Sequence, residues 1–175
     1  DKDVKTDAYN PDEAKKVLEA AGLKEIQLWA SDRVRPYNPN FQRAAELIQA
    51  DWAKVGVKAT IVNYEWTKYR EEGKKKDRPG AFQIGWTGDN GDPDNFFATL
   101  FACSAIGVSN YSSWCDKDFE DLIQKAKKTS DQAERTKLYE QAQVIFAKQA
   151  PAFLLAHSQV YAVVRNNVSG FKMDP

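Results

Sequence analysis

Residues 85–97 read GWTGDNGDPDNFF and place glycines, three carboxylates and aromatic side chains between two regular elements. Upstream, Phe82, Ile84 and Trp86 alternate with small or polar residues, the period of two that predicts a β-strand. Downstream, Asp92 precedes a proline, which predicts a helix N-cap followed by proline at the first helical position. The stretch is therefore predicted to be a turn from a strand into a helix.

The three carboxylates of this turn have different expected roles. Asp92 is expected to cap backbone amides, and Asp94 in the first helical turn complements the helix dipole. Asp89 is left without a structural role, just past the carboxyl end of a strand, where open α/β sheets bind ligands. The alternative for Asp89 is a turn residue that bonds its own backbone, as Asp-Asn-Gly sequences commonly do.

Strands and helices alternate along the chain before this turn. The expected elements are a helix from Asn10–Pro11 to Gly22, a strand with Ile26, Leu28 and Ala30, a helix from Asn38–Pro39 to Gly56, a strand from Val57 to Asn63, and a polar helix from Thr67 to about Asp77. The order strand, helix, strand, helix, strand over residues 26–86 predicts two right-handed crossovers and three parallel strands.

Parallel strands have their carboxyl ends at one edge of the sheet. That edge should carry the loop with Arg35, the corner from Tyr64 to Trp66, and the turn with Asp89. The sequence therefore predicts that a cationic loop, aromatic side chains and a carboxylate face one crevice. The alternative for Arg35 is a solvated loop arginine.

The final third of the chain is predicted to be mostly helical. Asp131 and Glu134 have the spacing of a capping box that opens a long helix, which stops before Pro151. Residues 152–164 follow with a continuous apolar run, which predicts a strand covered on both faces. His157 would be a core or edge residue of that strand.

Composition limits the possible classes of function. The 175 residues include 42% hydrophobic ones, enough for the core of one α/β domain or lobe. Twenty-five basic and twenty-five acidic residues give zero formal net charge, which argues against a nucleic-acid or anionic-membrane binder. No stretch approaches the roughly 18 apolar residues of a membrane span. We interpret the start at Asp1 as a processed or cut protein.

Cys103 and Cys115 bracket a loop rich in serine, glycine and asparagine. This spacing favours a disulfide in an exported protein over two free thiols in a reducing compartment. A zinc site is not expected, because His157 is the single histidine and four Cys or His ligands are not available. Pro93 and the missing glycine and glutamate spacing argue against a calcium-binding EF-hand loop, so we expect no metal and no cofactor.

Several strings resemble one known family. They are RPYNP at 35–39, QADWAKVGV at 49–57, YEW at 64–66, residues 85–101, and SNYSSWC at 109–115. Together they are similar to the dipeptide-binding proteins of bacterial ABC importers, within the wider family of peptide- and nickel-binding extracytoplasmic proteins. The resemblance runs over almost the whole chain.

The resemblance implies a fold. Members of the family have two lobes that close on their ligand like a clam shell. Residues 1–175 would then form a single lobe, most of the second, with the first lobe absent. That lobe would be an α/β, periplasmic-binding-protein-like unit, in which a mixed sheet with a parallel βαβ core is flanked by helices.

The resemblance also implies roles for particular residues. Asp89 matches the aspartate that receives the α-ammonium group of the peptide, and Arg35 matches the arginine that pairs with its carboxylate. Cleft-lining positions follow at Trp86, Thr87 and Gly88, and the two cysteines match a family disulfide. Burying a zwitterion costs several kcal/mol per charge unless each end is paired, so two fixed anchors would also measure dipeptide length.

The resemblance predicts a non-enzymatic, monomeric solute-binding lobe of the periplasm. It would capture dipeptides or short peptides and deliver them to ABC permease subunits in the inner membrane, without a cofactor or nucleic acid. One alternative is the ligand-sensing module of a regulator that uses the same fold. The other is a metal-assisted peptidase that uses Asp89, Asp92 and Asp94.

Overall fold

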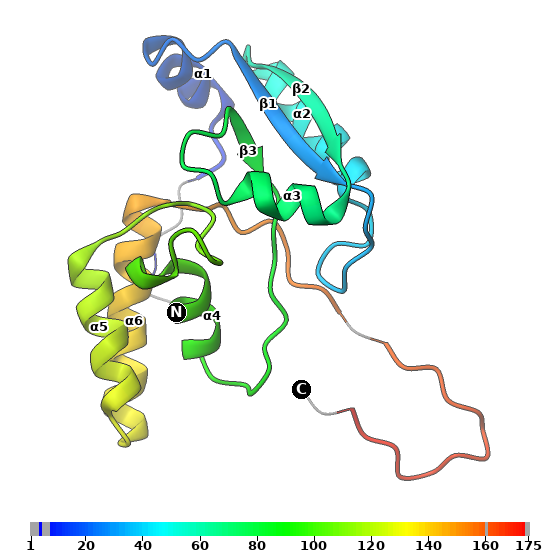
Figure 1. The fold of residues 1–175 in the computed structure, drawn as a ribbon, viewed down its shortest axis with the longest axis vertical. Helices are drawn as coiled ribbons and strands as arrows, with labels where there is room; N and C mark the ends of the chain where they lie inside the picture. Colours follow the sequence, from blue (N-terminus) through cyan, green and yellow to red (C-terminus); the bar gives the residue numbers. More distant parts are fainter. Residues whose placement is uncertain (1–3, 5–7, 160, 174–175) are drawn as a thin grey trace.

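The computed structural model describes residue 4, residues 8–159 and residues 161–173. It is an α/β structure with a three-stranded sheet, one group of helices around the sheet and a second group below it (Figure 1). The elements in chain order are α1 (Pro11–Ala20), β1 (Glu25–Ser31), α2 (Phe41–Lys54), β2 (Lys58–Tyr64), α3 (Trp66–Gly73), β3 (Gly80–Phe82), α4 (Asp94–Phe101), the 3-10 turn η1 (Cys103–Ala105), α5 (Lys117–Lys128) and α6 (Gln132–Gln149).

The three strands are parallel, as the sequence predicts, and their order in the sheet is β2-β1-β3. The register pairs Gln27 of β1 with Thr60 of β2 on one side and with Gly80 of β3 on the other. From β1 the chain passes through α2 to β2 on one side, and from β2 it passes through α3 to β3 on the other side of β1. Two right-handed crossovers in opposite directions place α2 and α3 on opposite faces of the sheet. The central strand β1 is consequently buried from Leu28 to Ser31.

Helix starts follow local capping rules, with one shift from expectation. Asn10 caps α1, because its side chain accepts from the backbone N–H of Glu13 at 3.1 Å, and a proline follows it. The second helix starts at Phe41 with Asn40 as its cap, so the predicted start at Asn38–Pro39 is wrong. Asn38 instead closes a tight turn, in which Arg35 and Asn38 exchange two backbone hydrogen bonds of 3.0 Å.

Two elements near the central turn are shorter than predicted. Helix α3 ends at Gly73 instead of Asp77, and β3 ends at Phe82 instead of reaching Trp86. Gly73 lies against the Phe82 ring, since a β-carbon at Gly73 would be 2.6 Å from a ring carbon. Beyond Phe82 the chain leaves the ladder because Gln83 bonds to other elements, as described below.

The buried side chains form two hydrophobic clusters. The sheet core contains Leu28, Trp29, Ala30, Phe41, Ala45, Ala59 and Tyr69. The helical core contains Ala102, Phe119, Ile123, Ala126, Leu138, Tyr139 and Ala142. Residues 83–93 connect β3, which packs against the sheet core, to α4, which packs against the helical core, so the predicted ligand turn is the link between the two.

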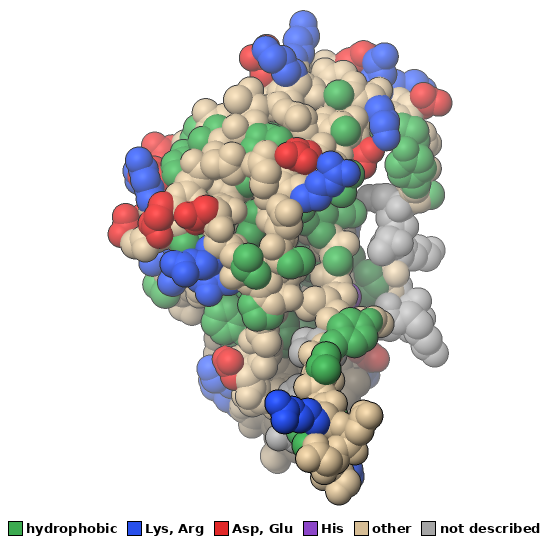
Figure 2. All heavy atoms as spheres, turned by 90° about the vertical axis from the view of Figure 1, so that its right-hand side faces the viewer, with side chains coloured by type: hydrophobic (Ala, Val, Ile, Leu, Met, Phe, Trp, Pro, Cys, Tyr) green, Lys and Arg blue, Asp and Glu red, His purple; other side chains and the backbone are tan. Residues whose placement is uncertain are grey.

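The predicted strand over residues 152–164 is wrong for the described residues of that range. After α6 the chain runs away from the body in an extended course without strand pairing (Figure 1). Phe153, Leu154 and Leu155 are 85%, 67% and 56% exposed, and His157 is exposed as well. Figure 2 views the molecule from the side on which this segment protrudes, and hydrophobic side chains are visible on that face. An apolar run becomes a strand only where a neighbouring strand supplies hydrogen-bond partners, and the described sheet offers none to it.

Other features of the described chain agree with expectation. Asp131 caps α6 by accepting from the Glu134 N–H at 2.8 Å, and α6 ends before Pro151. None of the helices in the described ranges combines the length and hydrophobicity that crossing a membrane requires.

The disulfide between Cys103 and Cys115 is formed and closes a loop across twelve positions. It joins η1 at the end of α4 to the residue before the Asp116 cap of α5. The loop between the cysteines is held further by Asn110, which is buried and donates to the carbonyls of Ala102 at 3.1 Å and Trp114 at 2.9 Å. The disulfide and the Asn110 hydrogen bonds together hold the loop that leads into α5 of the helical core.

Removing the disulfide should destabilise the chain. The double variant Cys103→Ser/Cys115→Ser is expected to lose about 3 kcal/mol of unfolding free energy, because closing a loop of this size restricts the unfolded chain. Urea titration of both proteins measures the difference. Two reactive thiols per chain in denatured, unreduced protein from an oxidising compartment would contradict the disulfide.

Candidate functional site

Three loops follow the carboxyl ends of the three strands, and direct contacts join them. The backbone N–H of Asp32, after β1, donates to the Tyr64 carbonyl at the end of β2 at 3.3 Å. Asn38 of the same loop donates from Nδ2 to Oε1 of Gln83, after β3, at 3.5 Å. The predicted convergence of these loops at one edge is confirmed.

Gln83 is the residue that holds this edge together. Only 6% of it is exposed, and its Nε2 donates to the carbonyls of Trp29 at 3.0 Å and Phe41 at 3.3 Å. Its backbone N–H donates to the Tyr69 hydroxyl at 3.0 Å, and that hydroxyl donates to the Gln83 carbonyl at 2.5 Å. Burial raises the pKa of Tyr69, so its hydroxyl stays protonated and keeps this donor role. In the sequence, Gln83 is one of the residues that alternate with Phe82, Ile84 and Trp86, and that pattern did not reveal this role.

Arg35 is stacked on an aromatic ring, which differs from a freely solvated arginine. Its guanidinium carbon lies 3.8 Å from the centroid of the Trp66 ring at the start of α3. Its Nε is buried and has no hydrogen-bond partner among the described residues. Stacking of this kind fixes the plane of a guanidinium while its edge can still meet a carboxylate through two parallel bonds.

Tyr37 connects the Arg35 loop to the Asp89 loop. A β-carbon on Gly85 would lie 2.4 Å from a Tyr37 ring carbon, so only glycine allows the backbone this close to the ring. Burial raises the pKa of the Tyr37 phenol. The two loops therefore touch at Tyr37, two residues after Arg35, and at Gly85, four residues before Asp89.

Asp89 is exposed and is held by Asn95 of α4. The Asn95 Oδ1 accepts from the Asp89 backbone N–H at 3.1 Å, and its Nδ2 donates to Asp89 Oδ2 at 3.3 Å. The same Oδ1 accepts from Trp86 Nε1 at 2.6 Å. Asp89 thus has a structural contact that the sequence did not predict, and Asn95 was missed as the residue that orients it.

The three expected cleft-lining positions lie on the same turn. Trp86 is 36% exposed and is fixed through its N–H to Asn95. Gly88 packs on Phe96, since a β-carbon there would lie 2.9 Å from a ring carbon. Thr87 between them is exposed. The turn thus rests on α4 and presents the Thr87 and Asp89 side chains to solvent.

The predicted role of Asp92 needs correction. Helix α4 begins at Asp94 with Pro93 at the cap position, not at Pro93 with Asp92 as its cap. One Asp92 oxygen does accept from the Asp94 N–H at 2.8 Å, but both oxygens also pair with the Arg135 guanidinium of α6. Hydrogen bonds from Arg135 lower the pKa of the Asp92 carboxyl below its ordinary value. The partner lies 43 positions away, so no local pattern could reveal it.

The three carboxylates proposed for a metal-assisted peptidase have separate surroundings. Asp89 bonds to Asn95, Asp92 pairs with Arg135, and an oxygen of Asp94 lies 3.8 Å from Lys127 Nζ. Within the described ranges, no three His, Cys, Asp or Glu side chains gather into a group that could hold a metal ion.

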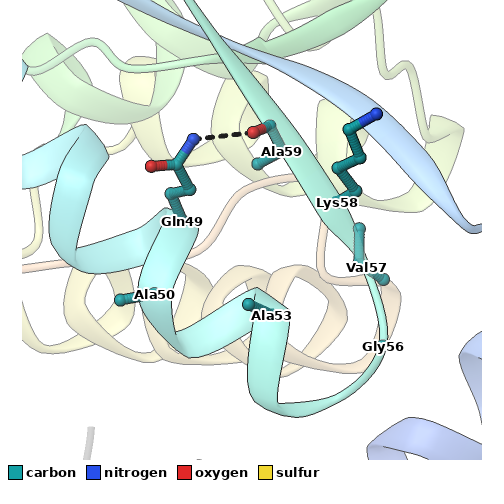
Figure 3. A pocket seen from close by; sticks show the side chains of 7 residues that line it. All are labelled: Gln49, Ala50, Ala53, Gly56, Val57, Lys58 and Ala59. Atoms are coloured by element: carbon teal, nitrogen blue, oxygen red, sulfur yellow. Dashed lines mark hydrogen bonds between the residues drawn. The ribbon is translucent and has the colours of Figure 1, made fainter.

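Neither of two pockets is lined by Arg35 or Asp89. One of about 500 Å³ is lined by the end of α2 and the start of β2, at the edge of the sheet opposite to Arg35 and Asp89 (Figure 3). There Gln49 Nε2 donates to the Ala59 carbonyl at 2.7 Å, and most other lining side chains are small and apolar. The second, about 460 Å³, lies between residues 91–93 and α6.

Comparison with known proteins gives a family match over much of this chain. The model described as "Bacterial extracellular solute-binding proteins, family 5 Middle" matches residues 1–108. A dipeptide-binding protein of Escherichia coli (strain K12) is 55% identical over 99% of the chain. A heme-binding protein A of Haemophilus influenzae is 43% identical over 95% of it. The chain spans about a third of the length of these curated relatives, 33% and 31%.

Solved structures agree with these matches. A dipeptide-binding protein from Pseudoalteromonas sp. SM9913, in complex with Met-Leu, superposes with a TM-score of 0.75 and 36% identity, over 83% of this chain and 29% of that one. HbpA2 from Haemophilus parasuis gives a TM-score of 0.77 and 44% identity, over 82% and 29%. The predicted α/β fold of the periplasmic-binding-protein type, with a parallel sheet flanked by helices, is confirmed.

The Asp92–Arg135 pair should make stability depend on acidity. The pKa of Asp92 is lower in the folded chain than in the unfolded one, so its contribution is fully present above about pH 4 and is lost as the pH falls through the folded-state pKa. Urea unfolding between pH 7 and pH 3 should show a steeper loss of stability for the parent chain than for Asp92→Asn. Parallel curves for the two proteins would contradict this assignment.

Proposed function

The chain belongs to the bacterial extracellular solute-binding proteins of family 5, and from this premise we propose that it is one lobe of a two-lobed receptor for dipeptides or short peptides. The observation that carries the proposal is that two loops in contact carry side chains of opposite charge, Arg35 on one and Asp89 on the other. Arg35 is fixed over Trp66, Asp89 is fixed by Asn95, and Tyr37 against Gly85 joins the loops.

Opposite charges at a fixed separation suit a zwitterion. Asp89 would receive the α-ammonium group of the peptide, and Arg35 would meet its carboxylate with two parallel hydrogen bonds. Each end of the ligand would then be paired, which offsets the cost of removing its charges from water. The distance between the anchors would select peptide length, and the backbone contacts would leave the side chains largely unread.

Trp66 supports the selectivity of the carboxylate end. A guanidinium lying flat on an indole ring is held in orientation and keeps its planar fork, which a lysine ammonium cannot reproduce. Trp86, Thr87 and Gly88 would line the cleft beside the ammonium end. This arrangement needs no catalytic residue, so we propose a binding role and not an enzymatic one.

A second lobe would complete the site. Both anchors lie at an open edge of this chain, where water screens a surface ion pair to about 0–1 kcal/mol. Closure of an opposing lobe would lower the local dielectric constant and strengthen both contacts. In this proposal the closed, monomeric receptor acts in the periplasm and delivers its peptide to ABC permease subunits in the inner membrane.

A heme ligand is the second candidate, because one relative is a heme-binding protein A. Heme carries two propionate groups of the same sign. A carboxylate at Asp89 would repel one of them, whereas it attracts an ammonium group. The charges of the proposed anchors therefore favour a peptide, and competition between a dipeptide and hemin for the two-lobed protein separates the two ligands.

Substitution of either anchor in the two-lobed protein should weaken dipeptide binding, because one end of the peptide then loses its charged partner. Asp89→Asn keeps the shape but strands a desolvated ammonium, with an expected loss on the order of 2 to 5 kcal/mol in calorimetry with a dipeptide. Arg35→Lys should also bind more weakly, since a point charge replaces the fork. The matched controls Asp32→Asn and Arg33→Lys change exposed residues of the same edge and should bind like the parent.

Modified ligands turn these substitutions into double-mutant-type cycles, in which a change to the protein is combined with a change to the peptide. N-acetylation of the dipeptide should weaken its binding to the parent, but should cost little more once Asp89 is Asn. C-amidation should show the same non-additivity with Arg35 and not with Asp89. Additive losses in both cycles would mean that neither residue contacts its assigned end.

Residues 1–175 alone are expected to bind peptides poorly. The anchors stay exposed to water when no opposing lobe covers them. Calorimetry with a simple dipeptide should therefore give a dissociation constant of about 1 mM or higher, which corresponds to a binding free energy no more favourable than about −4 kcal/mol. Submicromolar binding by this chain would show that the opposing lobe is not needed for the site.

A further inference from the structure

The turn that carries Asp89 is fixed at both ends by long-range contacts. At its start, Gln83 is bonded to the sheet core through Trp29 and Tyr69. At its end, Asp92 is bonded to the helical core through Arg135. Asp89 lies between these two points, three residues from the second.

Arg135 uses all three nitrogens of its guanidinium group. Its Nε donates to the Ala126 carbonyl in the last turn of α5 at 2.9 Å. Its Nη1 and Nη2 bind the two oxygens of Asp92, the second at 2.9 Å, and Nη2 also reaches the Tyr139 hydroxyl at 3.3 Å. The side chains of Arg135 and Asp92 are only 25% and 28% exposed. One side chain therefore ties α5, α6 and the end of the turn together.

The groups around Arg135 are packed against the helical core and the start of α4. Tyr139 lies in the helical core, and its ring stacks on Phe97 of α4 with centroids 5.6 Å apart. Asp92 in turn accepts from the N–H of Asp94, the first residue of α4. Movement of Asp92 would therefore disturb both the start of α4 and the turn before it.

We infer that Arg135 is a positioning residue for Asp89, the proposed ammonium anchor. By holding Asp92 in a bidentate pair, Arg135 fixes the conformation of the turn that carries Asp89. This inference rests on the proposed function, because it concerns the same site. Arg135 does not touch the peptide in this scheme and acts through Asp92 and the backbone of residues 89–92. A lysine at this position would keep the charge and lose the fork that sets the geometry.

Arg135→Lys in the two-lobed protein tests this inference. Dipeptide affinity is expected to fall roughly 10-fold, which corresponds to about 1.4 kcal/mol. The loss should largely disappear in the Asp89→Asn background, because a residue that acts through Asp89 is not additive with it. Amide hydrogen exchange of residues 85–91 without ligand should become faster, which shows loosening of the turn itself.

Lys125→Gln is the matched control, because Lys125 also joins α5 to α6, through Glu134 at 3.2 Å, without a link to the turn. It should leave affinity and exchange of the turn unchanged. Asp92→Asn removes the same pair from the other side and decides the matter if Arg135→Lys does not fold.

The two failures are distinguishable. Unchanged affinity in both Arg135→Lys and Asp92→Asn, with a loss in Asp89→Asn, overturns the inference and leaves the proposed function intact. Equal losses in the parent and Asp89→Asn backgrounds also overturn it, since they would reflect general destabilisation. Unchanged affinity in Asp89→Asn overturns the proposed anchor itself.

Discussion

The buried amide of Gln83 is the interaction on which the carboxyl edge depends. It bonds to backbone carbonyls of β1 and α2, while its own backbone bonds to a buried hydroxyl of α3. Leaving one such buried polar group unpaired costs about 1–3 kcal/mol, so each of these bonds favours the position in which Gln83 makes all of them. Because the chain turns out of the sheet at this residue, the same set decides where the turn with Asp89 starts.

Local signals in the sequence predicted much of the fold. Alternation and helix caps such as Asn10 and Asp131 depend on neighbouring residues, and crossover handedness then made the strands parallel and placed their loops at one edge. The same reasoning brought the loops of Arg35 and Asp89 together, and the structure joins them through Tyr37 and Gly85.

The remaining features depend on partners that are distant in sequence. Asp92 looks like a helix cap because a proline follows it, and its stronger partner is Arg135 on a helix that packs beside it only in the folded chain. The stacking of Arg35 on Trp66 likewise joins residues with no local relation. The apolar run at Phe153 predicted a strand covered on both faces, but a run of apolar residues does not say which strand or helix would cover and pair with it, and in the described chain these side chains are exposed.

The contact between Gln49 and Ala59 also affects how this sheet meets other chains. In β2 the N–H of Lys58 points to β1, so Ala59 faces the outer edge, and its carbonyl is already occupied by the Gln49 amide. The stretch of β2 still open to a foreign strand begins at Ile61 and ends with the strand at Tyr64, while β3 at the other edge has only three residues. Short edges template intermolecular pairing poorly, and the side-chain amide of Gln49 shortens the open part of this edge further.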